Sequence, residues 1–430
     1  MNHTRTFAAA ALGLIAAASA HAQQAPAAPS KGEYLARAGD CVACHSVPGG
    51  AAFAGGLKMG TPLGAIYSTN ITPDKETGIG DYTLADFDSA VRRGVAKDGH
   101  HLYPAMPYPS YAKITDADVA ALYDFFMKQV PAVKQANKPS EIPWYLGFRW
   151  PLALWNLVFT SSGAYADKQG HDAAWNRGAY LVQGLGHCGA CHTPRGWAFQ
   201  ETALDDGGSS FVRGAELDAW FAPDLRGDNL TGLGAWSQAD LAAFLESGHN
   251  EHATAFGSML DVINNSTPYL TADDANAMAA YLHSLPAAAQ QPAYAYNDAA
   301  AKALVAGKPT DAGGAIYLGS CISCHGADGK GHAPFIPPLA GNPVVLDSDP
   351  VSLVNLVLNG AQPLIAKGAP DSYRMPQYRV QLTDDEIASV LSFVRSNWGN
   401  GAGPVSADQV KMLRPVTDPS SDRVIILKMR

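Results

Sequence analysis

The sequence predicts a mainly α-helical protein built from three small domains in tandem. Its 430 residues exceed the length of one ordinary domain. One five-residue pattern, C-x-x-C-H, occurs three times, beginning at Cys41, Cys188 and Cys321. Behind each copy, a Thr-x-x-acid signature introduces an amphipathic segment with helical periodicity. With 47% hydrophobic and 16% charged residues, the chain has enough apolar material for several cores.

The N-terminus predicts a secretory signal peptide over residues 1–22. An apolar stretch follows Arg5, and Ala20, His21 and Ala22 provide a small-x-small cleavage pattern. The alternative is an N-terminal membrane anchor, but the apolar stretch is shorter than the ~18 residues of a spanning helix. No later stretch of the sequence is long enough to span a bilayer. We therefore expect the mature chain in the periplasm.

The three C-x-x-C-H motifs contain every cysteine of the chain. A zinc site would need paired C-x-x-C units around one ion, and a thioredoxin-like redox pair would not need the histidine. Covalent haem attachment needs all three residues, because the thiols form thioethers and the histidine becomes the proximal iron ligand. The sequence thus predicts three covalently bound haem c groups. The expected thioether residues are Cys41, Cys44, Cys188, Cys191, Cys321 and Cys324, and the proximal ligands are His45, His192 and His325.

The sequence around each motif also recurs. GEYLARAGDC at Gly32 matches GAYLVQGLGHC at Gly178, and the third copy has the shorter GAIYLGSC from Gly314. A Gly-rich segment from Asn70 has a shortened counterpart from Asn229, so the first two copies are close relatives. We expect cytochrome c-like domains over 31–140, 173–290 and 309–402, an aromatic connecting segment over 141–172 and a tail over 403–430.

A methionine follows each motif and is expected to complete the coordination of the iron. Met106, Met259 and Met375 precede a helix start by nine, twelve and eight residues. Each start has a threonine with an acidic residue three positions on, as in a reciprocal capping box. The pairs are Thr115 with Asp118, Thr271 with Asp274, and Thr383 with Glu386.

Histidines near the methionines are the competing ligands, and a methionine can also be core filler. The histidines keep no common register, because they lie six and five residues before Met106 but ten and seven before Met259. We therefore favour methionine at each iron. The competing residues are His100, His101, His249, His252 and His332.

The other ring nitrogen of each proximal histidine should donate to a fixed acceptor. The loop FIPPLAGN offers the carbonyls of Pro337 and Pro338, and Pro62 and Pro223 are candidates elsewhere; the alternative is ordinary loop proline. Candidate partners of the haem propionates are Asn70, Asn229, Arg195 and Trp236.

Longer runs carry a family resemblance. They include YSTNITPDKETGIG, LYPAMPYPSYAKIT, RWPLALWNLVF and WNRGAYLVQGLGHCGACHTPRG, and they extend over nearly the whole mature chain. In them the chain resembles the triheme cytochrome c subunits of membrane-associated periplasmic dehydrogenases, such as those for gluconate, sorbitol, fructose, glucose (FAD-dependent), alcohol and aldehydes.

The resemblance implies an electron-transfer subunit. Electrons from a separate catalytic dehydrogenase subunit, with or without a small third subunit, would enter the haems and leave to membrane ubiquinone or another acceptor. The tail DPSSDRVIILKMR has no long hydrophobic helix. A C-terminal membrane attachment, as in some relatives, is therefore not supported by the sequence.

The alternative function is that of a c-type haem enzyme, for example a peroxidase, with one open haem. Three plausible methionine ligands argue against an open iron, and no nucleotide-binding or nucleophile-elbow motif is present in the sequence. The net charge of −9 excludes nucleic acid as a natural partner, because phosphate binding relies on basic patches.

The segment from Ile142 to Phe159 is rich in tryptophan and leucine but contains no haem ligand. It would suit a brace between domains, or a surface at the membrane interface, where tryptophan and tyrosine settle at headgroup depth. Arg149 and Pro151 argue against a spanning helix. We expect this segment to attach the protein peripherally to the inner membrane.

Overall fold

The computed structural model describes residues 28–61, 63–160, 163–289, 291–366, 369–370 and 373–420. The predicted signal peptide, 1–22, lies outside these ranges, as do the last ten residues of the tail. The α-helices are α1 (Lys31–Ala38), α2 (Cys41–Cys44), α3 (Leu84–Arg93), α4 (Tyr108–Tyr111), α5 (Asp116–Lys128), α6 (Trp150–Phe159), α7 (Ala173–Tyr180), α8 (Gly189–His192), α9 (Gln238–Ser247), α10 (Met259–Asn265), α11 (Ala272–Ser284), α12 (Ala299–Val305), α13 (Ala312–Ser320), α14 (Ile322–His325), α15 (Pro343–Leu346), α16 (Val351–Asn359), α17 (Asp384–Ser396) and α18 (Ala407–Val416).

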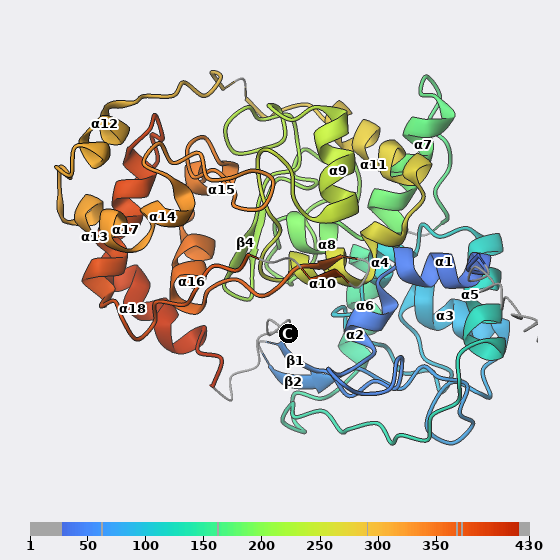
Figure 1. Cartoon of the computed structure of the whole chain (residues 1–430). Coiled ribbons are helices and arrows are strands. Elements are labelled where there is room, and N and C mark those ends of the chain that lie inside the picture. The colour runs from blue at the N-terminus through green and yellow to red at the C-terminus, as the bar shows by residue number, and fades with distance from the viewer. Residues whose placement is uncertain are drawn as a thin grey trace, which may run out of the picture.

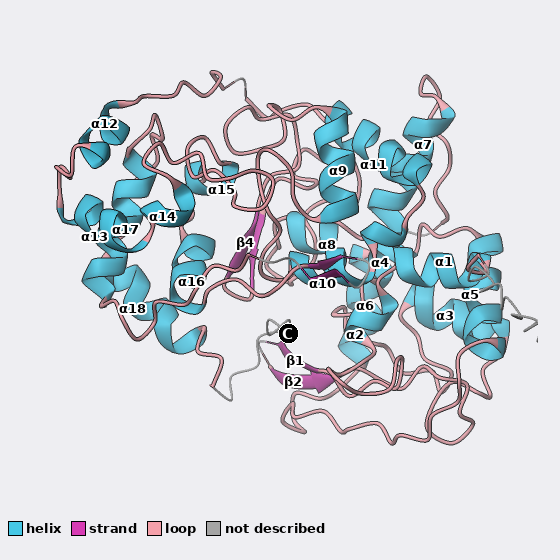
Figure 2. Ribbon diagram, in the orientation of Figure 1, coloured by secondary structure: helices cyan, strands magenta, loops and turns pink. Residues whose placement is uncertain are grey.

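Strands contribute little to the fold, so the predicted mainly helical class is confirmed (Figure 2). They form two-stranded antiparallel hairpins within the described ranges. The hairpins are β1 (Lys58–Thr61) with β2 (Gly64–Tyr67), β3 (Ala215–Leu217) with β4 (Trp220–Ala222), and β5 (Ile365–Ala366) with β6 (Ala369–Pro370).

A crossing pair of helices recurs three times, and we call the units that contain the pairs the first (31–130), second (173–285) and third (312–398) repeats. The pairs are α1 with α5, α7 with α11 and α13 with α17. At each crossing a glycine lets the backbones meet. A Cβ on Gly32, Gly178 or Gly313 would overlap a carbonyl oxygen of the partner helix, those of Ala121, Ala277 and Ser389 respectively.

The structure corrects one detail of the predicted alignment. Gly313, not Gly314, occupies the crossing in the third repeat. Gly32 thus precedes the first cysteine of its motif by nine residues, Gly178 by ten and Gly313 by eight. The extra residue in the second repeat is taken up by a π-helical turn, η1 (Leu181–Leu185), which continues α7.

The three predicted helix starts are confirmed. The hydroxyl groups of Thr115, Thr271 and Thr383 accept hydrogen bonds from the backbone N–H three residues on. Only Thr383 has the reciprocal bond, from its own N–H to the Glu386 carboxylate. The expected reciprocal box is wrong for the other two helices, because Asp118 and Asp274 bond to side chains of the neighbouring repeat.

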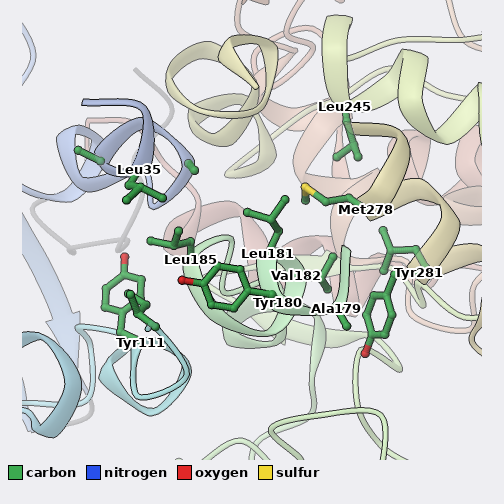
Figure 3. Close-up of a cluster of buried hydrophobic side chains, with 14 of the residues drawn as sticks. Leu35, Tyr111, Ala179, Tyr180, Leu181, Val182, Leu185, Leu245, Met278 and Tyr281 are labelled. Carbon is green, nitrogen blue, oxygen red and sulfur yellow. The ribbon is translucent and has the colours of Figure 1, made fainter. Parts of the chain in front are cut away.

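The first and second repeats share one hydrophobic core, and the third repeat has its own. Figure 3 shows Leu35 and Tyr111 of the first repeat facing Leu181 and Leu185 of the second. In Figure 1 the second repeat lies between the other two. Its β4 packs against α16 of the third repeat, where the backbone N–H of Phe221 donates to Ser352 at 2.8 Å.

Three segments outside the repeats carry a helix. Between the second and third repeats, α12 buries Ala300 and Leu304 in the core of the third repeat. In the connecting segment 141–172, α6 buries Asn156, which accepts a hydrogen bond from the Tyr108 hydroxyl at 2.7 Å. In the segment 403–430, α18 packs on α16 and α17 and buries Val410 in the core of the third repeat. Within the described residues, no helix combines the length and apolar character required to cross a membrane.

Candidate haem-attachment sites

Each C-x-x-C-H motif forms one short helical turn. The backbone N–H of the histidine donates to the carbonyl of the first cysteine at 3.0 Å in all three copies: His45 to Cys41, His192 to Cys188 and His325 to Cys321. A helical turn places positions i, i+3 and i+4 on one side. Both thiols and the imidazole of a motif can therefore reach one porphyrin, so the residues present fit covalent haem attachment.

The proximal histidines of the first two repeats are oriented by backbone carbonyls. Nδ1 of His192 lies 2.7 Å from the Pro223 carbonyl, as expected. Nδ1 of His45 lies 2.7 Å from the Thr69 carbonyl, and the candidate Pro62 lies outside the described residues. Since Nδ1 is taken in both rings, Nε2 is the nitrogen left to bind iron. The sequence analysis missed Thr69 because any residue can present a carbonyl.

The third proximal histidine is held less tightly. Burial lowers the pKa of His325, and the Pro337 carbonyl acts in the opposite direction. Nδ1 of His325 nevertheless completes no hydrogen bond within the described part of the chain. Burial also lowers the pKa of His45 and His192. All three imidazoles are therefore held neutral, which is the form that binds a metal.

The thiols do not have the character of a redox pair. Burial raises the pKa of Cys41 and of Cys188 to about 12, and that of Cys191 and of Cys321 to about 11. Disulfide oxidoreductases instead need a thiolate with a lowered pKa. The six cysteines form no disulfide in the structure. The raised pKa of Cys41, Cys188, Cys191 and Cys321 suits thiols kept intact for thioether formation.

Two of the three candidate methionines pack against the same hydrophobic core as the first cysteine of their motif. Met106 and Cys41 lie against the same core, and so do Met375 and Cys321. Met259 differs, because it begins α10 and packs in a small separate cluster that includes Leu364 from the third-repeat side. Met106 and Met375 therefore share a hydrophobic core with a cysteine of their motif, whereas Met259 lies in a separate cluster.

The competing histidines have other partners. Nδ1 of His100 lies 2.5 Å from Asp98, and that of His101 lies 3.1 Å from the Asn156 amide nitrogen. The ring of His252 stacks on Trp236, and that of His249 lies against Phe335. His332 is paired with Ile336 through the backbone only, which does not engage its imidazole.

The candidate propionate partners are engaged within the protein. The buried Asn70 donates to the Val133 carbonyl at 2.7 Å and accepts from the N–H of Thr72 at 2.9 Å, so its amide closes a loop. Asn229 donates to the Gln291 carbonyl at 3.0 Å. Trp236 is buried against His252, and Arg195 donates to the Ala190 carbonyl.

A buried carboxylate beside the second motif carries no signal in the sequence. Glu201 lies against the α8 turn, with Oε2 at 2.6 Å from the position that a Cβ on Gly189 would take. Burial raises the pKa of Glu201 to about 7, against the opposing charges of Arg195 and Lys113. The second attachment turn is therefore close to a carboxyl group that is partly neutral near pH 7.

Comparisons with known proteins agree with this chemistry. The cytochrome c family matches residues 176–286 and 310–398. The gluconate 2-dehydrogenase cytochrome c subunit of Pantoea cypripedii is 51% identical over 405 residues, 93% of this chain and 92% of the relative. The cytochrome c subunit of a quinone alcohol dehydrogenase from Gluconacetobacter polyoxogenes is 48% identical over 426 residues, 97% of this chain and 91% of the relative.

The fructose dehydrogenase cytochrome subunit of Gluconobacter japonicus is 37% identical over 414 residues, 90% of this chain and 82% of the relative. With 93% and 97% of the chain covered, the first two similarities include all three attachment turns. They include the first repeat, which lies outside the two stretches matched by the cytochrome c family. The chain therefore belongs to the family of cytochrome c subunits of quinone-dependent dehydrogenases, which includes those of the gluconate, alcohol and fructose enzymes.

Proposed function

We propose that this protein is a periplasmic electron-transfer subunit with three covalent haem c groups. It takes electrons from a catalytic dehydrogenase subunit and passes them to ubiquinone or another acceptor. The observation that carries the proposal is the attachment turn, which recurs three times with the same hydrogen bond from histidine to cysteine. When bound, haem supplies reversible one-electron exchange at its iron.

The residues of the chain have separate tasks in this function. The six cysteines hold the porphyrins, and the neutral imidazoles of His45, His192 and His325 bind the irons. Met106, Met259 and Met375 would each supply a second protein ligand to an iron, and a thioether ligand raises the reduction potential. The apolar cores against which the motifs pack exclude water from the cofactors. An iron with two protein ligands passes electrons without binding a substrate.

The second candidate function, a peroxidase-like haem enzyme, requires one iron without a distal protein ligand. The position of Met259, apart from the core that holds Cys188, makes the second repeat the place where such an iron would be found. The buried Glu201 beside that turn could act on a proton there. We favour electron transfer, because the homologous subunits match over nearly their whole length and belong to dehydrogenase complexes.

Intact mass and reduction kinetics test the proposal. The purified protein should exceed its polypeptide mass by three haem masses, because each motif supplies both thioethers. A catalytic subunit and its substrate should reduce the haems, whereas the isolated protein should oxidise no alcohol, sugar or aldehyde. Two or fewer haems from a strain with competent cytochrome maturation would refute the count. Substrate oxidation by the pure subunit would favour the haem-enzyme function.

We also propose peripheral contact with the inner membrane through α6 and its surroundings. The inner side of α6 braces the fold, since Trp155 donates to the Ala198 carbonyl at 2.9 Å and the buried Asn156 accepts from Tyr108. Its outer side and the adjoining loops expose large apolar side chains. They include Trp144 (83% exposed), Phe148, Trp150, Leu154, Leu157 and Trp197 (88% exposed). Exposed patches of this kind mark interaction sites, and tryptophan favours the membrane interface.

A triple substitution tests this surface. Trp144→Ser, Trp150→Ser and Leu157→Ser together should shift the protein from sedimenting vesicles of anionic and zwitterionic lipid to the supernatant, with haem content unchanged. The control, Val305→Ser with Val380→Ser, removes apolar groups that are 78% and 87% exposed elsewhere. Unchanged vesicle binding by the triple variant would place the attachment elsewhere. Loss of haem would assign the segment to the core.

A further inference from the structure

The first two repeats are joined by two equivalent hydrogen bonds, one in each direction. The Tyr34 hydroxyl of the first repeat donates to Asp274 of the second at 2.5 Å. The Tyr180 hydroxyl of the second repeat donates to Asp118 of the first at 2.6 Å. Each tyrosine lies two residues after the crossing glycine of its repeat, and each aspartate lies three residues after the capping threonine. The two contacts are thus related by pseudo-two-fold symmetry.

The equivalence extends to the surrounding groups. Each tyrosine hydroxyl also accepts from the backbone N–H of the opposite capping threonine, Thr271 at 3.2 Å for Tyr34 and Thr115 at 3.3 Å for Tyr180. Each aspartate pairs with the cation just before the crossing glycine of its own repeat. Lys31 lies 2.7 Å from Asp118, and Arg177 lies 2.7 Å from Asp274. Both carboxylates are buried, so these bonds are shielded from competing water.

The same interface brings the first two attachment turns together. The Tyr111 hydroxyl donates to the carbonyl of Gly39, two residues before Cys41, at 2.8 Å. The ring of Tyr111 also lies 5.6 Å from that of His187, the residue before Cys188. Groups attached to the two turns would therefore be neighbours.

The residue that enters each of these two motifs has a left-handed backbone. Asp40 has a φ of 48° and His187 a φ of 36°. This conformation is uncommon for residues other than glycine and persists where the surroundings enforce it. Ser320, the corresponding residue of the third repeat, simply ends α13. Of the three repeats, only the two that face each other thus have a left-handed residue directly before the first cysteine of the motif.

The third repeat lacks the other parts of the contact too. Ala315 occupies the position of the tyrosine, and Ala312 that of the cation. Glu386 remains in its own capping box. The third repeat meets the second elsewhere, with the Asn355 amide donating to the Ala219 carbonyl at 2.9 Å. The paired tyrosine contacts therefore occur between the first two repeats and are absent from the third repeat within the described residues.

We propose that Tyr34 and Tyr180 are positioning residues that hold the first two attachment turns as a fixed pair, so that an electron passes directly between the first and second haems. The inference rests on the proposed function. In the exchange, the ferrous iron of one haem is oxidised and the ferric iron of the other is reduced, with no bond made or broken. The two symmetric contacts add to the shared core a resistance to both sliding and rotation of the repeats.

The test compares the wild type with a double variant that carries both Tyr34→Phe and Tyr180→Phe. In partly reduced protein, exchange of haem-methyl NMR signals reports the rate of electron exchange between haems. We expect the rate of exchange between the first and second haems to fall severalfold. The rate between the second and third haems should remain unchanged. Haem content by mass and the charge-transfer band of methionine ligation should stay as in the wild type.

Tyr317→Phe is the matched control, because the hydroxyl of this buried tyrosine donates to the Gly326 carbonyl at 2.7 Å within the third repeat. It should leave exchange between the first two haems unchanged. A wild-type rate in the folded double variant would overturn the inference. If the double variant loses haem, the exchange rate between the first and second haems is measured in the two single variants, each of which keeps one contact. A wild-type rate in both would then overturn the inference. Fewer than three haems in the wild type would instead refute the proposed function.

Discussion

Gly313→Ala should destabilise the third repeat, whereas Gly319→Ala in the same helix should stabilise it. A Cβ at Gly313 would overlap the Ser389 carbonyl and lie 2.9 Å from Cβ of Phe393, so α13 and α17 would have to separate. Overpacking of this kind costs about 1–3 kcal/mol. Gly319 is exposed, and a Cβ there would meet no heavy atom within 4 Å. Alanine in a helix is favoured over glycine by about 1 kcal/mol.

The two substitutions are matched in helix and in chemistry, so their difference isolates the crossing contact. Hydrogen exchange of peptides from α13 and α17 should become faster in Gly313→Ala and slower in Gly319→Ala. Covalent haem at Cys321 and Cys324 should decrease in the first variant only. Equal protection in both variants would contradict the view that close backbone approach at this glycine holds the repeat together.

Removal of the methionine ligands should open the haems one at a time. Met106→Ala, Met259→Ala and Met375→Ala should each make one haem reactive towards carbon monoxide, while the wild type resists. Each substitution should also lower the potential of that haem, because the thioether favours ferrous iron. Optical titration with carbon monoxide, normalised to haem content, measures the effect.

Met412→Ala serves as the control, since this methionine on α18 is 66% exposed and should bind no iron. If the wild-type protein binds one equivalent of carbon monoxide, one of the three methionine assignments is wrong. Met259 would be the first to re-examine, because it packs in its own small cluster and not on the core that holds Cys188. The second repeat would then be the place of an open iron.

Local sequence was sufficient for the elements that carry the chemistry. A C-x-x-C-H run can place two thiols and an imidazole on one helical turn wherever it occurs, and this turn forms in all three copies. A threonine with an acidic residue three positions on marks a helix start, because the backbone N–H that donates to the threonine hydroxyl lies within the same four residues. The helix starts at Thr115, Thr271 and Thr383 were therefore predictable.

Contacts between distant segments were not predictable, because they depend on backbone groups that every residue shares. The acceptor for His45 is a carbonyl at Thr69, a residue type without any distinguishing signal. The shift from Gly314 to Gly313 likewise depends on which glycine meets the Ser389 carbonyl across the crossing. Only the packing of α13 on α17 decides between the two adjacent glycines.

The sequence by itself determined the three C-x-x-C-H turns, the histidine that ends each of them and the capped helices behind them. The tertiary structure alone decided what the two capping-region aspartates do. The sequence predicted that Asp118 and Asp274 would bond to their own helix starts. Each instead accepts a hydrogen bond from a tyrosine hydroxyl of the opposite repeat. A carboxylate bonds to the best-placed donor, and a buried tyrosine hydroxyl without an acceptor would cost about 1–3 kcal/mol. The shared core of the two repeats leaves these aspartates as the acceptors within reach.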